Sequence, residues 1–124
     1  MNIILNIGLN DKKTKKQRVK TDYAIQLIGE HVRNCTITET VGFYKGEREN
    51  SLKVEIYGID AYTAISYAEH FALIFNQECV ALTAEGKTFF VDAFPSTAEY
   101  TDMLEEMGVA SMDTWEIKMV HSIT

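Results

Sequence analysis

The chain has 124 residues, of which 46% are hydrophobic and 24% charged, and its formal net charge is −6 at pH 7. This composition is typical of a globular protein and excludes a disordered chain, and the length suits one domain over residues 1–124. The negative charge argues against a DNA or RNA polymer as partner. No apolar run approaches the ~18 residues of a membrane span and the start lacks a secretion signal, so we expect a cytoplasmic protein without membrane contact.

Basic residues are concentrated in one short segment, which contains six of the twelve lysines and arginines: Lys12, Lys13, Lys15, Lys16, Arg18 and Lys20. With Asp11 counted, this segment carries +5, so the rest of the chain carries −6 − 5 = −11. Such an asymmetry favours a local site for a small anion over a surface that binds a polyanion. The alternative is an ordinary solvated loop.

The first half of the chain alternates strands and helices. Residues 3–9 are apolar at nearly every position, which predicts a central strand covered on both faces. Thr21 or Asp22 can cap a helix that runs to about Arg33. Two alternating segments, 36–44 and 51–57, predict strands joined by a hairpin connection over residues 45–50.

The second half begins with the clearest helix of the sequence. Asp60 starts it, and its apolar stripe consists of Ala61, Ile65, Ala68, Ala72 and Phe75. Strands are predicted over 78–83 and 87–92, joined by a turn at Glu85-Gly86. Ser96 and Glu99 form a capping box for a short helix that ends at Gly108. The tail around Trp115 alternates again, which predicts a last strand or an arm on a neighbouring subunit.

This order of elements predicts an α+β fold with a ferredoxin-like βαββαβ core over residues 1–83, followed by an added strand, a short helix and a tail. Right-handed crossovers then bring three polar segments to one end of the sheet. They are the basic segment, the hairpin from Tyr44 to Ser51 and the Asn76-Gln77 turn. Cations, an open helix N-terminus, an aromatic ring and amides at one place suit a phosphate-bearing nucleotide.

No catalytic or metal-binding motif is visible. Cys35 and Cys79 are far apart and are expected to be buried free thiols. His31, His70 and His121 are too scattered for a linear ligand motif. Serine elbows, Walker loops and zinc helices are absent from the sequence, so we expect neither a cofactor nor a metal. An enzyme assembled from distant residues remains open at this point.

Two segments, Gly42-Phe43-Tyr44-Lys45-Gly46-Glu47-Arg48-Glu49-Asn50-Ser51 and Phe75-Asn76-Gln77-Glu78-Cys79-Val80, resemble the first family of Thoeris anti-defence proteins from phages and prophages. The likeness spans about residues 40–92. It implies an oligomeric sponge, a dimer or higher, that binds a cyclic ADP-ribose isomer in a bacterial host without cleaving it. It therefore implies that the chain is not an enzyme and that it blocks a TIR-based defence.

The convergence of the loops, together with this ligand, gives each candidate residue a role. Tyr44 would stack on adenine, and Asn50, Asn76 and Gln77 would contact ribose or base edges. The phosphates would be held by Lys16, Arg18, Lys20 and Arg48. Two other functions stay open: an acidic phage inhibitor that binds a protein partner, as anti-CRISPR proteins do, and a regulatory ferredoxin-like domain that binds a metabolite.

Overall fold

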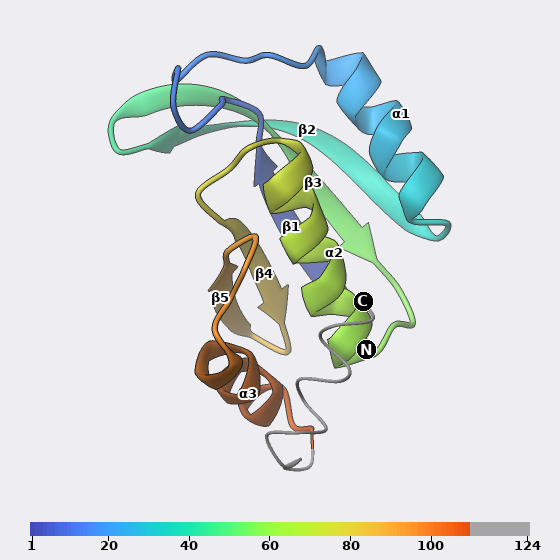
Figure 1. Cartoon of the computed structure of the whole chain (residues 1–124). Coiled ribbons are helices and arrows are strands. Elements are labelled where there is room, and N and C mark those ends of the chain that lie inside the picture. Colours follow the sequence, from blue (N-terminus) through green and yellow to red (C-terminus); the bar gives the residue numbers. More distant parts are fainter. Residues whose placement is uncertain (110–124) are drawn as a thin grey trace.

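Strand β1 (Ile3–Gly8) lies at the centre of a five-stranded antiparallel sheet with the order β2-β3-β1-β4-β5 (Figure 1). The computed structural model describes residues 1–109. The other strands are β2 (Cys35–Tyr44), β3 (Glu47–Ile56), β4 (Val80–Ala84) and β5 (Lys87–Val91). The helices are α1 (Thr21–His31), α2 (Ala61–Ile74) and α3 (Thr97–Glu106). The predicted α+β fold with a ferredoxin-like core and an added strand is confirmed.

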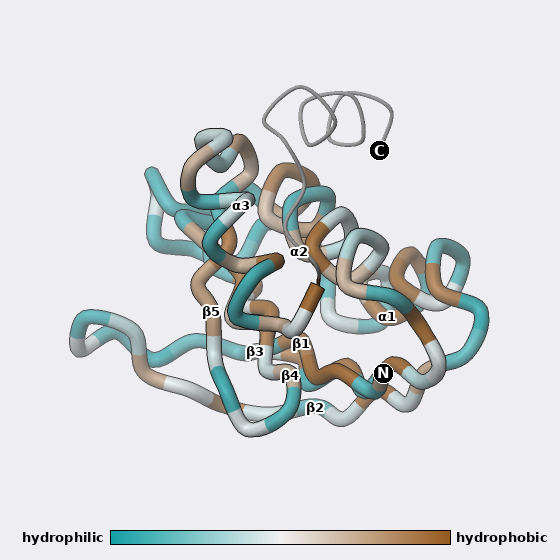
Figure 2. The backbone as a smooth tube through the Cα atoms, turned by 90° about the horizontal axis from the view of Figure 1, so that it is seen from below, coloured by the Kyte–Doolittle hydropathy of each residue, from teal (hydrophilic) through white to brown (hydrophobic). Residues whose placement is uncertain are grey.

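The helices cover one face of the sheet (Figure 2). Alternate residues of β1, namely Ile3, Leu5 and Ile7, are buried on this face. The predicted stripe of α2 is buried in full. Because an apolar stripe on a helix must be removed from water, packing α2 on the central strands forms the core.

The opposite face of the sheet, the open face, carries no helix among residues 1–109. The prediction that β1 is covered on both faces is therefore wrong. Ile4 and Gly8 are half-buried and Asn6 is exposed. These residues are paired with Glu55, Lys53 and Ser51 of β3, and Ile4 and Asn6 are also paired with Thr83 and Ala81 of β4. Most side chains on this face are polar or small, which explains why it does not need a second layer.

The β2–β3 hairpin is longer than the sequence predicts. Its connection is only Lys45-Gly46, with φ values of 50° and 81°, the left-handed pair of a type I′ turn. Strand β3 therefore begins at Glu47, and residues 47–50 are paired with β2. Figure 1 shows this hairpin reaching well beyond the rest of the sheet, beneath the segment that follows β1.

The helix ends differ in detail from the predictions. Lys20, not Thr21 or Asp22, is the N-cap of α1, without a side-chain cap bond, and α1 ends at His31. The capping box of Ser96 and Glu99 on α3 is confirmed, as is the Glu85-Gly86 turn.

Cys35 and Cys79 are free thiols, as expected, but they are half-buried and not buried. The predicted tail lies outside the described residues. Within those residues, no helix combines the length and apolar character needed to cross a bilayer.

Candidate functional site

Three segments that are distant in sequence meet at one end of the sheet. The Lys12 N–H donates to the Asn76 carbonyl at 2.9 Å, and the Gln77 side chain donates to the Asn10 carbonyl. The hairpin joins the same cluster, because the Asn50 side chain donates to the Gln17 side chain at 2.9 Å. The predicted convergence of the basic loop, the β2–β3 hairpin and the α2–β4 turn is therefore confirmed.

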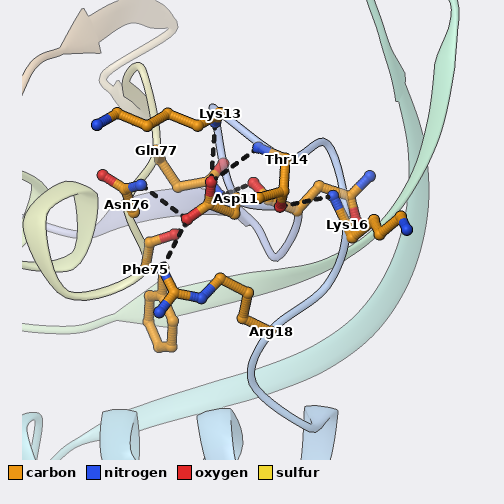
Figure 3. A network of polar contacts seen from close by, with 9 residues as sticks. Asp11, Lys13, Thr14, Lys16, Arg18, Phe75, Asn76 and Gln77 are labelled. Carbon is orange, nitrogen blue, oxygen red and sulfur yellow. Dashed lines mark hydrogen bonds and ion pairs between the residues drawn. The ribbon is translucent and has the colours of Figure 1, made fainter.

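Asp11 is the hub that fixes the basic loop (Figure 3). Its side chain is only 3% exposed, and it accepts hydrogen bonds from the Asn76 amide at 2.7 Å and the Arg18 guanidinium at 3.0 Å. The backbone N–H groups of Lys13 and Thr14 also donate to it. The Asn76 hydrogen bond, followed by that from Thr14, holds the pKa of Asp11 far below its usual value. The loop is thus tied to the end of α2 by a carboxylate that stays charged.

A cavity of about 200 Å³ opens where these segments meet. Both signs of charge line it, together with one aromatic ring and two amides. The lining residues are Asn10, Asp11, Lys12, Lys15, Tyr44, Lys45, Glu47, Glu49, Gln77 and Glu78. A cavity with convergent charged and polar groups is suited to a small polar ligand.

Tyr44 and Glu78 form a tight pair on the wall of this cavity. The Tyr44 hydroxyl donates to Glu78 Oε2 at 2.5 Å, and Lys45 Nζ lies 3.3 Å from the same oxygen. The hydrogen bond to the Glu78 carboxylate raises the pKa of Tyr44 to about 12. The same bond, with help from Lys45, lowers the pKa of Glu78. At neutral pH, Tyr44 is therefore a hydrogen-bond donor and Glu78 a carboxylate.

Glu49 reaches the cavity across the end of β1. Its carboxylate lies so close to Gly8 that a Cβ atom there would be 2.4–2.6 Å from its oxygens and carboxyl carbon. Glu49 Oε2 also accepts the Asn10 N–H at 3.0 Å. The absence of a side chain at Gly8 and this backbone donor together hold a carboxylate in one place, which is the preorganisation that binding and catalytic sites need.

A second hollow of about 420 Å³ adjoins the first on the open face of the sheet. The two share Tyr44, Glu49, Gln77 and Glu78. The second is lined mainly by small residues and by the rings of Phe43 and Phe90, which are 73% and 70% exposed. Cys79 also lines it, but burial raises the pKa of this thiol, which disfavours a thiolate nucleophile. The two hollows form a polar end and a more apolar end of one site.

The structure brings two of the predicted ligand residues, Tyr44 and Gln77, to the cavity. Arg18 and Asn76 instead line a separate hollow of about 200 Å³ beside Asp11, and Asn50 borders another beside α1. None of these four hollows is lined by Lys16, Lys20 or Arg48. The eight predicted ligand residues therefore do not form one site: two line the cavity, three line other hollows and three line none of the four.

Strand alternation explains why Arg48 and Asn50 are off the cavity. They belong to a strand, and their neighbours Glu47 and Glu49 point to the open face where the cavity lies. Sequence reasoning missed these two glutamates because it placed residues 45–50 in a connection. The signal that could have found them is the Lys-Gly dipeptide, which is suited to a two-residue hairpin turn.

A scan against known protein families finds no match, and no curated protein matches by sequence. One solved structure has a similar fold. It is a phage SAM lyase in its apo state, with a TM-score of 0.52 and 16% sequence identity. The likeness covers 77% of this chain and 90% of that chain. At this identity the likeness shows a shared fold.

This neighbour bears on two expectations from the sequence, namely that the chain is not an enzyme and that it resembles the Thoeris anti-defence family. The expectation that the chain is not an enzyme is contradicted by this neighbour, because an enzyme, the SAM lyase, has the same fold. The absence of a sequence motif did not reveal this, since a fold can carry a catalytic site built from residues that are distant in sequence. The neighbour comes from a phage, as the proteins of the sequence resemblance do, but it is not a Thoeris anti-defence protein. The likeness therefore supports the fold and gives no support to the Thoeris family in particular.

Proposed function

We propose that the chain is a lyase that acts on S-adenosylmethionine or a closely related sulfonium nucleoside. The observation that carries this proposal is the cavity in which Tyr44, Glu47, Glu49 and Glu78 converge. Carboxylates and an aromatic ring are the groups that attract an organic cation. The fold likeness to a SAM lyase supports the same ligand class.

The two adjoining hollows suit the two parts of such a molecule. The polar cavity would take the sulfonium and the amino-acid head, which are charged. The hollow on the open sheet face would take the nucleoside, with Phe43 or Phe90 available to stack on the base. Tyr44 and Glu49 lie at the junction of the hollows, where the reacting carbon and sulfur atoms would be.

The chemistry of a sulfonium lyase needs little from the protein beyond placement and charge. When the carbon–sulfur bond breaks, its electron pair goes to sulfur and the leaving group is a neutral thioether. The carbon then bonds to the carboxylate oxygen of the same molecule, giving a lactone, or the neighbouring carbon loses a proton to a base, giving an alkene. Both routes release 5′-methylthioadenosine, and neither adds water.

In this reaction Glu49 is the carboxylate best placed to act as a base or to stabilise a cation, because Asn10 and Gly8 fix its position. Tyr44 keeps its proton, so it would orient the substrate or Glu78 rather than accept a proton. Removal of the host's S-adenosylmethionine would disable defence enzymes that need this cofactor. We therefore place the proposed activity in phage anti-defence.

The test is incubation of the purified chain with S-adenosylmethionine and detection of 5′-methylthioadenosine by mass spectrometry. We expect release by the wild type and a loss of at least about 100-fold in Glu49→Gln, the lower end of what a positioned acid or base contributes. Gly8→Ala should impair the reaction too, because its Cβ would displace the Glu49 carboxylate. Glu105→Gln, an exposed change on α3, is the matched control and should keep full activity. Absence of the thioether with wild-type protein would sink the proposal.

A cyclic ADP-ribose isomer is the second candidate ligand. The observation that favours it is the presence of Lys12, Lys15 and Lys45 on the cavity wall, since ammonium groups bind phosphates. Incubation with such isomers, removal of free ligand and heating of the protein would release whatever was bound. Mass spectrometry of the released material then separates retention from cleavage, and recovery of no nucleotide would exclude this ligand class.

A further inference from the structure

We infer that the cavity recognises the zwitterionic α-amino-acid head of its ligand, with the carboxylate held by Lys12 and Lys15 and the ammonium by Glu47 and Glu49. This inference rests on the proposed function, because it assigns the specificity of the same site. It makes the head group, in addition to the sulfonium, a condition for binding.

The two lysines are fixed at the rim through their backbone. The Lys12 N–H donates to the Asn76 carbonyl, and the Lys15 N–H donates to the Asp11 carbonyl at 2.8 Å. Lys15 has a φ of 62°, a left-handed conformation that the tight loop around Asp11 imposes. Neither ammonium group forms an ion pair within residues 1–109. Lys15 attracts the Glu78 carboxylate from a longer distance and helps to lower its pKa. Two cations therefore line the cavity without a counterion at ion-pair distance among the described residues.

The two glutamates come from β3 and also lack a cationic partner among the described residues. Glu47 is paired with Tyr44 across the hairpin, and one oxygen of Glu49 accepts the Asn10 N–H. The other charges of the cavity are already matched, since Glu78 is paired with Lys45 and Asp11 with Arg18. What remains is two positive and two negative side chains that line the same small space without neutralising one another.

A zwitterion is the ligand that satisfies both pairs at once. A diphosphate would bring its negative charges close to Glu47 and Glu49, and like charges at short range in a cavity are repulsive. A simple cation such as a polyamine would leave the lysines unmatched and repelled. An α-amino acid carries one carboxylate and one ammonium two bonds apart, so it can use each wall of the cavity.

The test compares ligands and variants in equilibrium binding by calorimetry. Sinefungin retains the amino-acid head and nucleoside of S-adenosylmethionine but has an amine in place of the sulfonium, so it binds without carbon–sulfur cleavage. Decarboxylated S-adenosylmethionine lacks only the carboxylate. We expect the double variant Lys12→Met, Lys15→Met to weaken sinefungin binding about fivefold to tenfold, the effect of two exposed ion pairs. The same variant should strengthen binding of the decarboxylated compound, because this cation has no carboxylate for the lysines and is repelled by them.

The matched control is Lys13→Met with Lys16→Met, which removes two charges from the same loop but none from the cavity wall. It should bind both ligands as the wild type does. Two outcomes would overturn the inference while leaving the proposed ligand class intact. In the first, the Lys12 and Lys15 changes weaken the binding of both ligands equally. In the second, the control variant weakens sinefungin binding as much as the Lys12 and Lys15 changes do. Failure of the wild type to bind either ligand would instead overturn the proposed function.

Discussion

At the scale of single residues, Asp11 determines how the basic loop responds to acid. Its pKa in the folded chain lies well below the ordinary value of 3.8, chiefly because Asn76 donates to the carboxylate, so protonation weakens the folded form. The stabilisation is complete above pH 4 and declines as the pH falls towards the folded-state pKa, because the unfolded chain takes up the proton first. We therefore expect Asp11→Asn to lower Tm by a few degrees at pH 7, with the difference from wild type shrinking as the pH approaches 3.

Scanning calorimetry between pH 3 and pH 7 measures this difference. Asp102→Asn, at an exposed position on α3, is the matched control and should shift Tm little at any of these pH values. A difference between Asp11→Asn and wild type that stayed constant with pH would show that the lost interactions do not depend on the charge of Asp11.

At the scale of elements, the turn at Lys45-Gly46 holds the hairpin that supplies Tyr44, Glu47 and Glu49 to the cavity. Gly46 has a φ of 81°, where a side chain is strained, whereas Gly29 lies in α1 with open space around its Cα. Gly46→Ala should therefore reduce the free energy of unfolding by about 1–2 kcal/mol. Gly29→Ala should increase it by about 0.5–1 kcal/mol, because alanine is the better helix former.

Urea unfolding of both variants measures these opposite signs. The amide protons at the hairpin tip report the local effect, and they should exchange faster in Gly46→Ala only. If the two variants changed stability in the same direction, the left-handed conformation assigned to Gly46 would be wrong.

The elements also show how far sequence reasoning reaches in this chain. Helix α2, the capping box at Ser96 and the order of elements along the chain follow from local periodicity and capping chemistry, and the structure confirms them. The start of β3 does not follow from such local patterns, because residues 47–50 are polar and become a strand only through pairing with β2. That one misplaced boundary decides which side chains reach the cavity, since neighbouring strand residues point to opposite faces. The loop convergence was therefore predicted, whereas finding the glutamates of the site required recognition of the two-residue turn at Lys45-Gly46.

At the scale of the whole molecule, the sheet separates a packed face from an open one. Every helix of residues 1–109 lies on one side of the sheet (Figure 2). The residues that line the second hollow of the site lie on the other side. The expected homo-oligomer stays a prediction. A second copy of the chain would have the exposed ring of Phe90 on the open face available for contact. The core therefore lies on one face of the sheet, and part of the proposed site lies on the other.

A matched pair of phenylalanines tests this division. Phe71 of α2 is 0% exposed and packs edge-on against His31, whereas Phe90 of β5 is 70% exposed on the open face. Phe71→Ala should lower the free energy of unfolding by about 3–5 kcal/mol, because it leaves a cavity in the core. Phe90→Ala should cost less than about 1 kcal/mol, since most of that ring is already in water. Urea unfolding at two protein concentrations measures both effects. A large loss in Phe90→Ala that depended on concentration would mean that a second copy of the chain covers the open face, and the hollow on that face would then be part of a subunit interface.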